Sequence, residues 1–452
     1  MIQRPNALDG CFLTYERQQR NVRPYIGVVL RAAGSPPSLH RVREQVGDRI
    51  ERMPTLACTV TKRKRRTVWE PDPDFDPHRH VHEVCLTGCT STLEETVDSL
   101  LGATVPDRSP RWEVWLIHGY SPREYALFYR AHHSAQDGQA LMDAVTALFG
   151  TEPADVPRAA APPAGLPWAQ RIPVRAVARS VADRMQTFGP SLAWSTKHTL
   201  TGEAQLVSAA VPASLLREAG RALGATSNDI CLAALAAALR SWMPESWLAP
   251  HQRGRDLHVG LPISVRYPEE RFSVGNRFSA IRIPLSFWEE SATARVAAIA
   301  RTTGRVRTEG MRRVLRAQLS LPEWLIYRIV RQAASARNGL DSTGLLRIPG
   351  RLALGADPIK TAVPTLFLHE GRILAVSFLS YGGQVAVSFT IDRALTDLGD
   401  LPALWAGAVE QLWRESESRP QHMYDPQGSH GRSLAHSAVA LTSNRPKPSS
   451  QH

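Results

Sequence analysis

Apolar residues recur along the first part of the chain in a pattern that predicts alternating strands and helices. Residues 25–30, 112–117 and 125–129 are apolar and partly β-branched, which is typical of core strands. After the first of these strands, apolar residues return at helical spacing behind the candidate cap Ser38: Leu39, Val42, Val46, Ile50 and Met53. A second helix is expected from Gly138 onward, with one apolar face formed by Leu141, Ala144, Val145, Leu148 and Phe149.

The second part of the chain shows the same alternation of element types. Strands are predicted at 206–211, 257–263, 278–285, 365–368, 373–378 and 385–391. Helices are predicted at 213–223 and 228–242, and a last helix has one apolar face: Leu401, Leu404, Trp405, Ala408, Leu412 and Trp413. A stretch rich in Ala and Pro separates the two parts, which is typical of a linker.

These elements predict a mixed α/β (α+β) protein built from two halves. We expect an N-terminal half over 1–151, a linker with amphipathic connecting helices over 152–204, and a C-terminal half over 205–420. The polar residues 421–452 are expected to be disordered. The longest apolar stretch, Ile230 to Leu239, is too short to span a bilayer and should be a buried helix.

The composition is that of an ordinary folded protein with a surplus of arginine. Of 452 residues, 43% are hydrophobic and 21% are charged, and the formal net charge is +12. The positive residues are mostly scattered singly, and no zinc-knuckle, helix-turn-helix or RNA-binding signature accompanies them. We therefore expect no nucleic-acid partner, and the charge suits other anions such as phosphorylated cofactors or acidic lipid headgroups.

The cysteines and the N-terminus predict a cytoplasmic location. Five cysteines form an odd set without metal-type spacing, which suits a reducing cytosol better than a disulfide framework. No apolar signal region follows Met1. Between Arg312 and Arg331, arginines alternate with apolar residues, which suits an interfacial helix as well as a surface helix packed on the core. Peripheral membrane contact is therefore left open.

Two further patterns have both a structural and a functional interpretation. The basic run 62–66 lies between two strand-like segments, so it is either a solvated hairpin turn, which we favour, or an attractor of CoA phosphates or an anionic membrane. His78, His80 and His82 would share one face of a strand, but no carboxylate or cysteine is arranged with them. We therefore predict no metal site.

The strongest chemical signal is the run His132-His133-Ser134-Ala135-Gln136-Asp137-Gly138, at the end of a predicted strand and just before a helix. A thioester already carries a good leaving group, so its transfer to an alcohol needs little more than a base that removes the hydroxyl proton. Histidine, with an ordinary pKa of about 6.5, suits that step. His133 is the candidate base. Side chains alternate along a strand, so His132 should point the other way, and a structural role is preferred for it.

Asp137 and Gly138, at the end of this run, are expected to have supporting roles. Asp137 can bind the backbone or an arginine and so fix the loop, while Gly138 permits a tight backbone. The pattern arises by chance rarely, though not never, so the alternative is that both histidines are structural.

Several landmarks in order resemble the bacterial wax ester synthase/diacylglycerol acyltransferase family, which belongs to the superfamily of chloramphenicol acetyltransferase and peptide-synthetase condensation domains. The resemblance runs from about Leu8 to Leu412. Its landmarks are Trp69–Asp76 with His80, Asp107–Glu113, His132–Gly138, Ser227–Ile230, Leu261–Arg266, Gly275–Ser279, Ser380–Gly383 and Asp392.

The resemblance implies two chloramphenicol acetyltransferase-like halves with a substrate tunnel between them. His133 would lie mid-tunnel as the general base, reached by acyl-CoA from one side and by an alcohol from the other. Asp137 would be structural, while Asn276 and the pair Asn228 and Asp229 would support the cleft from the second half. Acyl-CoA would be a co-substrate, with no cofactor, and a membrane or lipid-droplet surface would be a further partner.

Two departures from the family pattern concern the substrates. Many relatives carry an arginine soon after the helix that ends near Met53, but here Ala57 and Cys58 stand there, so the partner of Asp137 is not identified. The segment Ile348–Arg351 is a degenerate form of the family's Asn-Val-Pro-Gly-Pro loop, which borders the tunnel.

Three functions remain under comparison. The first is an O-acyltransferase that acts on diacylglycerol or a long-chain alcohol. The alternative is a condensing acyltransferase of secondary metabolism, which uses a CoA or carrier-protein thioester and a non-lipid alcohol or amine. A non-catalytic lipid-binding protein is disfavoured because His133, Asp137 and Gly138 are intact.

Overall fold

A computed structural model of the protein describes residues 5–19, 22–63, 66–105, 110–152, 192, 198–248, 254–333, 340–395 and 400–418. The described residues up to Glu417 belong to one compact unit. The predicted disordered tail and most of the predicted linker, including its amphipathic segment at 168–185, lie outside the described residues.

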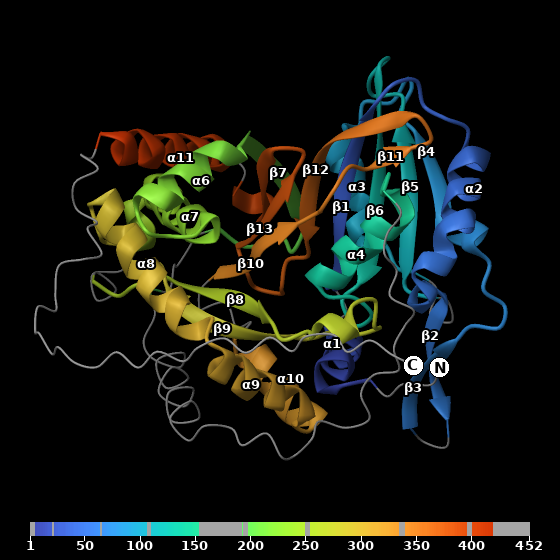
Figure 1. Ribbon diagram of the computed structural model, residues 1–452, viewed down its shortest axis with the longest axis horizontal. Helices are drawn as coiled ribbons and strands as arrows, with labels where there is room; N and C mark the ends of the chain where they lie inside the picture. The colour runs from blue at the N-terminus through green and yellow to red at the C-terminus, as the bar shows by residue number, and fades with distance from the viewer. Residues whose placement is uncertain are drawn as a thin grey trace, which may run out of the picture. The chain divides into compact units, whose positions relative to one another are not determined.

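A six-stranded sheet forms the core of the first half, with strand order β11-β12-β1-β6-β5-β4 (Figure 1). Its strands are β1 (Tyr25–Ala33), β4 (Val81–Cys85), β5 (Trp112–His118), β6 (Glu124–His132), β11 (Ala353–Leu354) and β12 (Asp357–Leu366). Neighbouring strands are antiparallel except β4 and β5. The helices α1 (Ala7–Gln18), α2 (Leu39–Arg49) and α4 (Gly138–Phe149) share one apolar cluster with this sheet, and α3 (Leu93–Gly102) packs on the opposite face.

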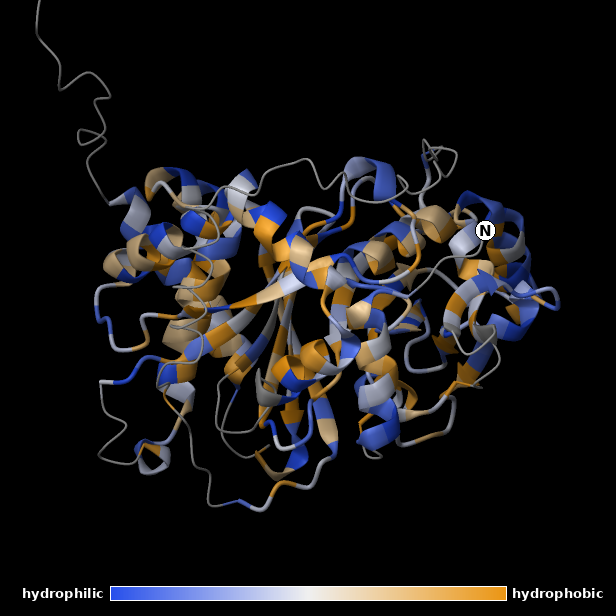
Figure 2. Cartoon of the chain, turned by 90° about the horizontal axis from the view of Figure 1, so that it is seen from below, coloured by the Kyte–Doolittle hydropathy of each residue, from blue (hydrophilic) through white to orange (hydrophobic). Residues whose placement is uncertain are grey.

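The second half contains another six-stranded sheet, with strand order β7-β14-β13-β10-β8-β9. Its strands are β7 (Ala204–Pro212), β8 (His258–Ser264), β9 (Phe278–Pro284), β10 (Leu340–Arg347), β13 (Leu374–Tyr381) and β14 (Gln384–Asp392). The helices packed on it are α6 (Ala213–Ala222), α7 (Ser227–Trp242), α8 (Ala292–Val306) and α11 (Leu401–Glu417). Figure 2 shows hydrophobic residues concentrated on the strands and on the helix faces that cover them, as burial of apolar surface requires.

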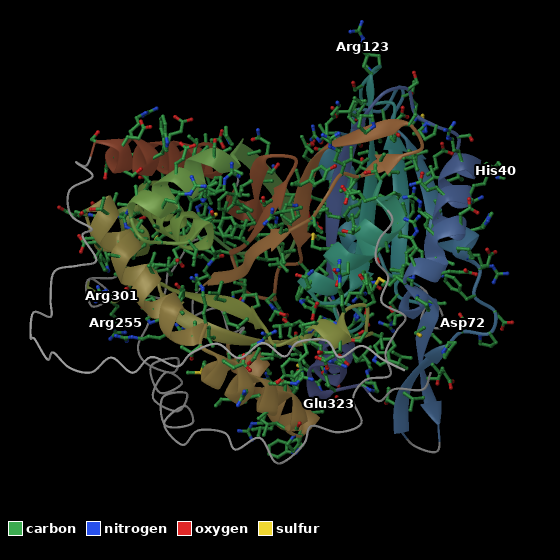
Figure 3. The ribbon with its side chains drawn as sticks, viewed as in Figure 1. His40, Asp72, Arg123, Arg255, Arg301 and Glu323 are labelled. Carbon is green, nitrogen blue, oxygen red and sulfur yellow. The ribbon has the colours of Figure 1, made fainter. Side chains whose placement is uncertain are left out.

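Two more helices complete the unit. The helices α9 (Glu309–Ala317) and α10 (Glu323–Ala333) lie beside β9 and α1 (Figure 1). Glu323, labelled in Figure 3, joins α10 to α1 by accepting a hydrogen bond from Thr14 Oγ1 at 2.7 Å.

The predicted elements of both halves are largely confirmed. The helices α1, α3 and α8 were not predicted, and there are three further differences. The strand expected at 365–368 is the end of β12, which starts at Asp357. The strand β10 was not predicted, because its first half carries polar residues and a glycine where it borders a cavity rather than a core. Leu404 does not belong to the apolar face of α11, since it is 37% exposed, whereas Leu401, Trp405, Val409 and Leu412 are buried.

Around the basic run, β2 (Cys58–Arg63) and β3 (Arg66–Pro71) pair as an antiparallel hairpin, and Lys64 and Arg65 lie outside the described residues. The three histidines at 78, 80 and 82 do not share one strand. Residues Pro77–His80 form a 3-10 helix, because Pro77 starts a turn capped by Asp76, and the strand begins only at Val81. Among the described residues, no group of three or more His, Cys, Asp or Glu side chains could hold a metal ion.

The strand β12 links the two sheets. It pairs with β1 in the first sheet, although the chain around it belongs to the second half. The Tyr381 hydroxyl donates to Ile359 O at 3.0 Å, and Thr390 Oγ1 donates to Leu366 O at 2.7 Å. These contacts hold β12 against β13 and β14. The strand β12 therefore lies in the C-terminal half of the chain, after residue 205, but belongs to the sheet of the first half.

Within the described part of the chain, no single helix is long and apolar enough to cross a membrane. The helices α6 and α7 pass that test only as a pair bent by 99°, and α7 is the buried helix that the sequence predicted over Ile230–Leu239.

Candidate active site

A cavity of about 790 Å³ lies between the two sheets, and His133 is one of its lining residues. Its walls come from β1 and β12 of the first sheet, from β8, β9 and β10 of the second, and from α9 and α10. Much of the lining is apolar and includes Leu8, Phe12, Leu315, Leu319, Ile326 and Val330. Such a cavity accepts a long apolar chain, because burying it removes apolar surface from water.

His133 is held in the turn between β6 and α4. The strand ends at His132, and the His133 backbone N–H donates to Pro24 O at 2.7 Å. The imidazole stacks on the Phe12 ring at a centroid distance of 4.1 Å and an interplanar angle of 9°. The Phe278 and Phe367 rings stand at 5.5 and 6.2 Å. Three aromatic neighbours therefore fix the plane of the ring.

Asn276 decides which nitrogen of His133 carries the proton. The Asn276 amide nitrogen donates to Asp9 Oδ1 at 2.8 Å and to His133 O at 2.7 Å, and both of these atoms are acceptors. The amide oxygen therefore faces His133 Nδ1, 3.1 Å away, so Nδ1 must donate. The neutral ring then keeps its lone pair on Nε2, which is the nitrogen able to accept a proton.

Asn276 itself is anchored by the first turn of α1. Asp9 Oδ1 accepts from the Asn276 backbone N–H at 2.7 Å, and Asn6 Nδ2 donates to Asn276 O at 2.6 Å. Asn6 and Asp9 also form the capping box of α1, in which each side chain accepts the backbone N–H of the other. Helix capping and positioning of the histidine thus share the same two side chains.

The surroundings lower the pKa of His133 to about 4. Burial is the main cause, because the aromatic and apolar neighbours disfavour the charged ring, while Asp137 and Asn276 partly oppose the shift. The imidazole is therefore neutral near pH 7 and is available as a base.

Asp137 is buried and its partner is Arg266. Arg266 Nη2 donates to Asp137 Oδ2 at 2.9 Å, and the Arg277 backbone N–H donates to the same oxygen at 2.7 Å. Asp137 Oδ1 caps α4 by accepting the Ala140 N–H at 2.8 Å. Burial would raise the pKa of Asp137, but the Arg266 charge and these donors outweigh it, and the pKa is lowered. Asp137 therefore joins the histidine loop to the second sheet.

His132 is fully buried and points away from the cavity. Its Nδ1 accepts the Ser134 backbone N–H at 3.1 Å, and its Nε2 lies 3.3 Å from Glu16 Oε2. Although burial opposes ionisation of Glu16, hydrogen bonds and charges from His132 and Arg111 lower the pKa of Glu16 to about 2. Both nitrogens of His132 therefore serve contacts inside the protein.

The remaining predicted residues lie further from the histidine. A Cβ atom on Gly138 would come within 2.9 Å of Leu346 Cδ2, so a larger residue there would require the Leu346 side chain to move. Asn228 Oδ1 accepts the Leu345 N–H at 2.9 Å, and Asp229 caps α7 and lies 2.8 Å from Arg307 Nη2. Neither residue lines the cavity, and their support of the cleft stays a prediction.

Sequence analysis did not identify Phe12, Asp9 or Arg266 as site residues. Arg266 ends the run Leu261–Arg266, which served only as a landmark of the resemblance, and its ion pair with Asp137 joins residues 129 positions apart along the chain. Asp9 follows Asn6 at capping-box spacing, which signals a helix start but not a role beside a histidine. Phe12 gives no such signal.

Comparison with known families assigns both halves of the chain. The family model "Wax ester synthase/diacylglycerol acyltransferase catalytic domain" matches residues 6–229, and the model "WS/DGAT C-terminal domain" matches residues 274–412. A Mycobacterium tuberculosis protein, Rv3087, named as a diacylglycerol O-acyltransferase, is 26% identical over 46% of this chain and 51% of its own length. The chain thus matches about half the length of that relative. A protein of the same species named as a probable diacylglycerol O-acyltransferase, tgs1, is 22% identical over 91% of this chain and 96% of its own length.

Solved structures show the same fold at low sequence identity. The wax ester synthase/diacylglycerol acyltransferase from Marinobacter aquaeolei VT8 is 19% identical, with a TM-score of 0.62 over 92% of this chain and 100% of that chain. The first condensation domain of the calcium-dependent antibiotic synthetase is 16% identical, with a TM-score of 0.60 over 92% and 96%. The expected fold of two α/β halves is confirmed.

Proposed function

Because the chain belongs to the wax ester synthase/diacylglycerol acyltransferase family of acyltransferases, we propose that it transfers a fatty acyl group from acyl-CoA to an alcohol, with His133 as the general base. The observation that carries the proposal is a neutral imidazole with its Nε2 lone pair free to act, placed on the wall of a largely apolar cavity.

In the proposed reaction the acceptor oxygen attacks the thioester carbonyl carbon while Nε2 of His133 takes the hydroxyl proton. The bond between the carbonyl carbon and sulfur then breaks, and the thiolate leaves with the electron pair. The imidazolium returns its proton to the sulfur, so the products are an ester and a free thiol. The hydrogen bond from Nδ1 to Asn276 Oδ1 holds the ring in the required tautomer throughout.

For the acceptor we propose diacylglycerol or a long-chain alcohol. The support is the apolar lining of the cavity and the naming of relatives as diacylglycerol O-acyltransferases. A condensing acyltransferase of secondary metabolism, with a carrier-protein thioester or a non-lipid acceptor, is the second candidate. It is favoured by the charged residues that the same cavity also contains, among them Arg282, Asp341 and Arg372.

The test is release of free thiol and mass spectrometry of products when the full chain is mixed with a panel of acyl-CoA donors. The acceptors are diacylglycerol and hexadecanol, each against a blank without acceptor. Ester formation that requires His133 is the expected result. No turnover with either acceptor, but turnover with a polar alcohol or amine, favours the second candidate instead.

We also propose a cytoplasmic protein that touches a membrane or lipid-droplet surface through α10. The support is Trp324, which is 62% exposed and is followed by Arg328 one turn further along α10. Co-sedimentation with vesicles containing anionic lipid should fall when Trp324 is replaced by Ala, with Trp288→Ala as the control. Equal sedimentation of both variants and the wild type contradicts this contact.

A further inference from the structure

The cavity has a charged end that the proposed chemistry does not use. Arg282 of β9 and Arg372, just before β13, both line it, together with His369. Arg372 is only 4% exposed, and its Nη2 lies 3.5 Å from Asp341 Oδ1. Asp341 Oδ2 lies 3.8 Å from His369 Nε2. This group of four residues is called the arginine end below.

Strand register leaves room inside the arginine end. Gly260 of β8 pairs with Arg282 on one side and with Asp341 on the other. A Cβ atom at Gly260 would have Asp341 Oδ1 as its nearest neighbour, at 3.7 Å. Because Gly260 has no side chain, the space between the arginine and the aspartate opens into the cavity that all three residues line.

The arginine end carries net positive charge. Burial and the neighbouring Arg372 guanidinium lower the pKa of Arg282 to about 10, so Arg282 remains cationic near pH 7. Burial also lowers the pKa of His369, which favours the neutral ring. Asp341 offsets one of the two positive charges. Two like charges on one low-dielectric wall repel each other, and an anion between them would relieve that repulsion.

Buried hydroxyl groups provide an independent sign of a polar ligand. Thr365 and Ser377 line the cavity and are 3% and 1% exposed. Among the described residues, neither hydroxyl oxygen has a hydrogen-bond partner. A buried polar group left without a partner costs about 1–3 kcal/mol. Thr365 of β12 and Ser377 of β13 thus place two buried hydroxyl groups in the wall of the same cavity.

Strand β9 runs from the histidine to the arginine end. The Phe278 ring lies 5.5 Å from the His133 ring, and Arg282 is four residues further along the same strand. At the rise of a β-strand, that separation is about 13 Å. An extended, unbranched molecule with its hydroxyl group at His133 can therefore place a second polar group between Arg282 and Arg372.

We propose that the arginine end binds an anionic group, a carboxylate or a phosphate, on the acyl acceptor. The preferred acceptor is then an amphiphile whose hydroxyl and anion are separated by an apolar spacer. The inference rests on the proposed function, because it takes His133 as the transfer site. The phosphates of CoA are the other source of such an anion. They fit less well, because they are attached to a bulky adenosine while Arg372 is almost fully buried.

The direct test is binding, which does not depend on acyl transfer. Calorimetry compares an ω-hydroxy fatty acid with the fatty alcohol of equal length. The wild type should bind the acid tighter by about ten-fold or more, and Arg282→Gln and Arg372→Gln should each remove that preference. Arg301→Gln is the matched control, because Arg301 is exposed on α8 and does not line the cavity (Figure 3). Equal affinity of the wild type for both compounds overturns the inference.

Two further arms separate the remaining explanations. Arg282→Lys keeps the charge and should retain most of the preference. If Arg372→Gln does not fold, the contrast between Arg282→Gln and Arg282→Lys still tests the inference. The turnover arm uses acyl-CoA and the matching acyl N-acetylcysteamine thioester, which has no phosphates. If Arg282→Gln slows only the acyl-CoA reaction, the anion belongs to CoA and the inference is wrong. Turnover of neutral alcohols without any preference for the acid refutes this inference alone, whereas no turnover of any alcohol refutes the proposed function.

Discussion

The two adjacent histidines at the end of β6 have opposite hydrogen-bonding patterns. His132 Nδ1 accepts a backbone N–H from Ser134, and its Nε2 faces the carboxylate of Glu16. His133 Nδ1 donates to Asn276, so its Nε2 is the basic nitrogen. The first ring is enclosed inside the N-terminal half, and the second lines a cavity between the two halves.

This difference shows that the environment, rather than the residue type, assigns the chemistry. In each histidine, the partner of Nδ1 determines which ring nitrogen carries the proton. For His132 this partner is a donor two residues away, and for His133 it is an acceptor from a distant part of the chain. Glu16 comes from the same half as His132, whereas Asn276 comes from the other half of the chain. The base therefore depends on the correct docking of the two sheets, and the structural histidine does not.

The largest expected effect separates the two histidines directly. His133→Ala should lower kcat by about 10²–10⁴-fold, because the proton acceptor is lost, with little change in the melting temperature. The matched change His132→Ala should mainly destabilise the fold, since it leaves the buried Ser134 N–H without its acceptor and removes the contact of His132 with Glu16. Steady-state kinetics with thermal unfolding checks both variants. Comparable kcat for His133→Ala and the wild type eliminates the proposed base.

Arg266 tests the link between the halves. Arg266→Met leaves the Asp137 carboxylate buried without its cation and should cost about 3–5 kcal/mol in the free energy of unfolding. The control is Arg313→Met, whose partner Glu309 is one turn away on an exposed helix face, with an expected change of about 0–0.5 kcal/mol. Chemical denaturation measures both. A loss for Arg266→Met no larger than that of the control refutes the structural role of this ion pair.

The hydrogen bond between Asn276 and His133 is tested by its effect on the position of the ring proton. Asn276→Leu removes the acceptor that holds Nδ1–H, so both tautomers become populated and kcat should fall by about 10–100-fold. Nitrogen NMR of histidine-labelled protein should show His133 as a mixture of tautomers in the variant, while His132 keeps its wild-type signals. An unchanged His133 spectrum contradicts this positioning role.

The smallest effect is on the pH profile. The pKa of His133 is lowered to about 4, so kcat/KM should be flat near neutral pH and should fall only as the pH drops toward that value and the ring becomes protonated. The free energy of unfolding should change with pH in the same direction. The pKa of His133 is lower in the folded state than in the unfolded chain, so its contribution to stability is complete above about pH 6.5 and is lost as the pH falls through about 4. A midpoint of the activity profile near pH 6.5 instead shows a ring exposed to solvent.

Much of the fold followed from local patterns. Strands such as β1, β6 and β14 and helices such as α4, α7 and α11 have continuous or periodic apolar residues, which are fixed by burial of one or both faces. The strand β10 escaped prediction because it borders the cavity, where polar residues and Gly344 replace the apolar alternation.

By itself the sequence determined the element types, the family resemblance and the run that contains His133, because these are properties of neighbouring residues and their spacing. Only the tertiary structure decided that Asp137 pairs with Arg266, that Asn276 orients His133, and that two arginines share one end of the cavity. The physical reason is distance along the chain. These pairs join residues more than 80 positions apart. The contacts of Asp137 and His133 form only when two separately built sheets pack against each other through β12, whereas the two arginines come together within the second sheet.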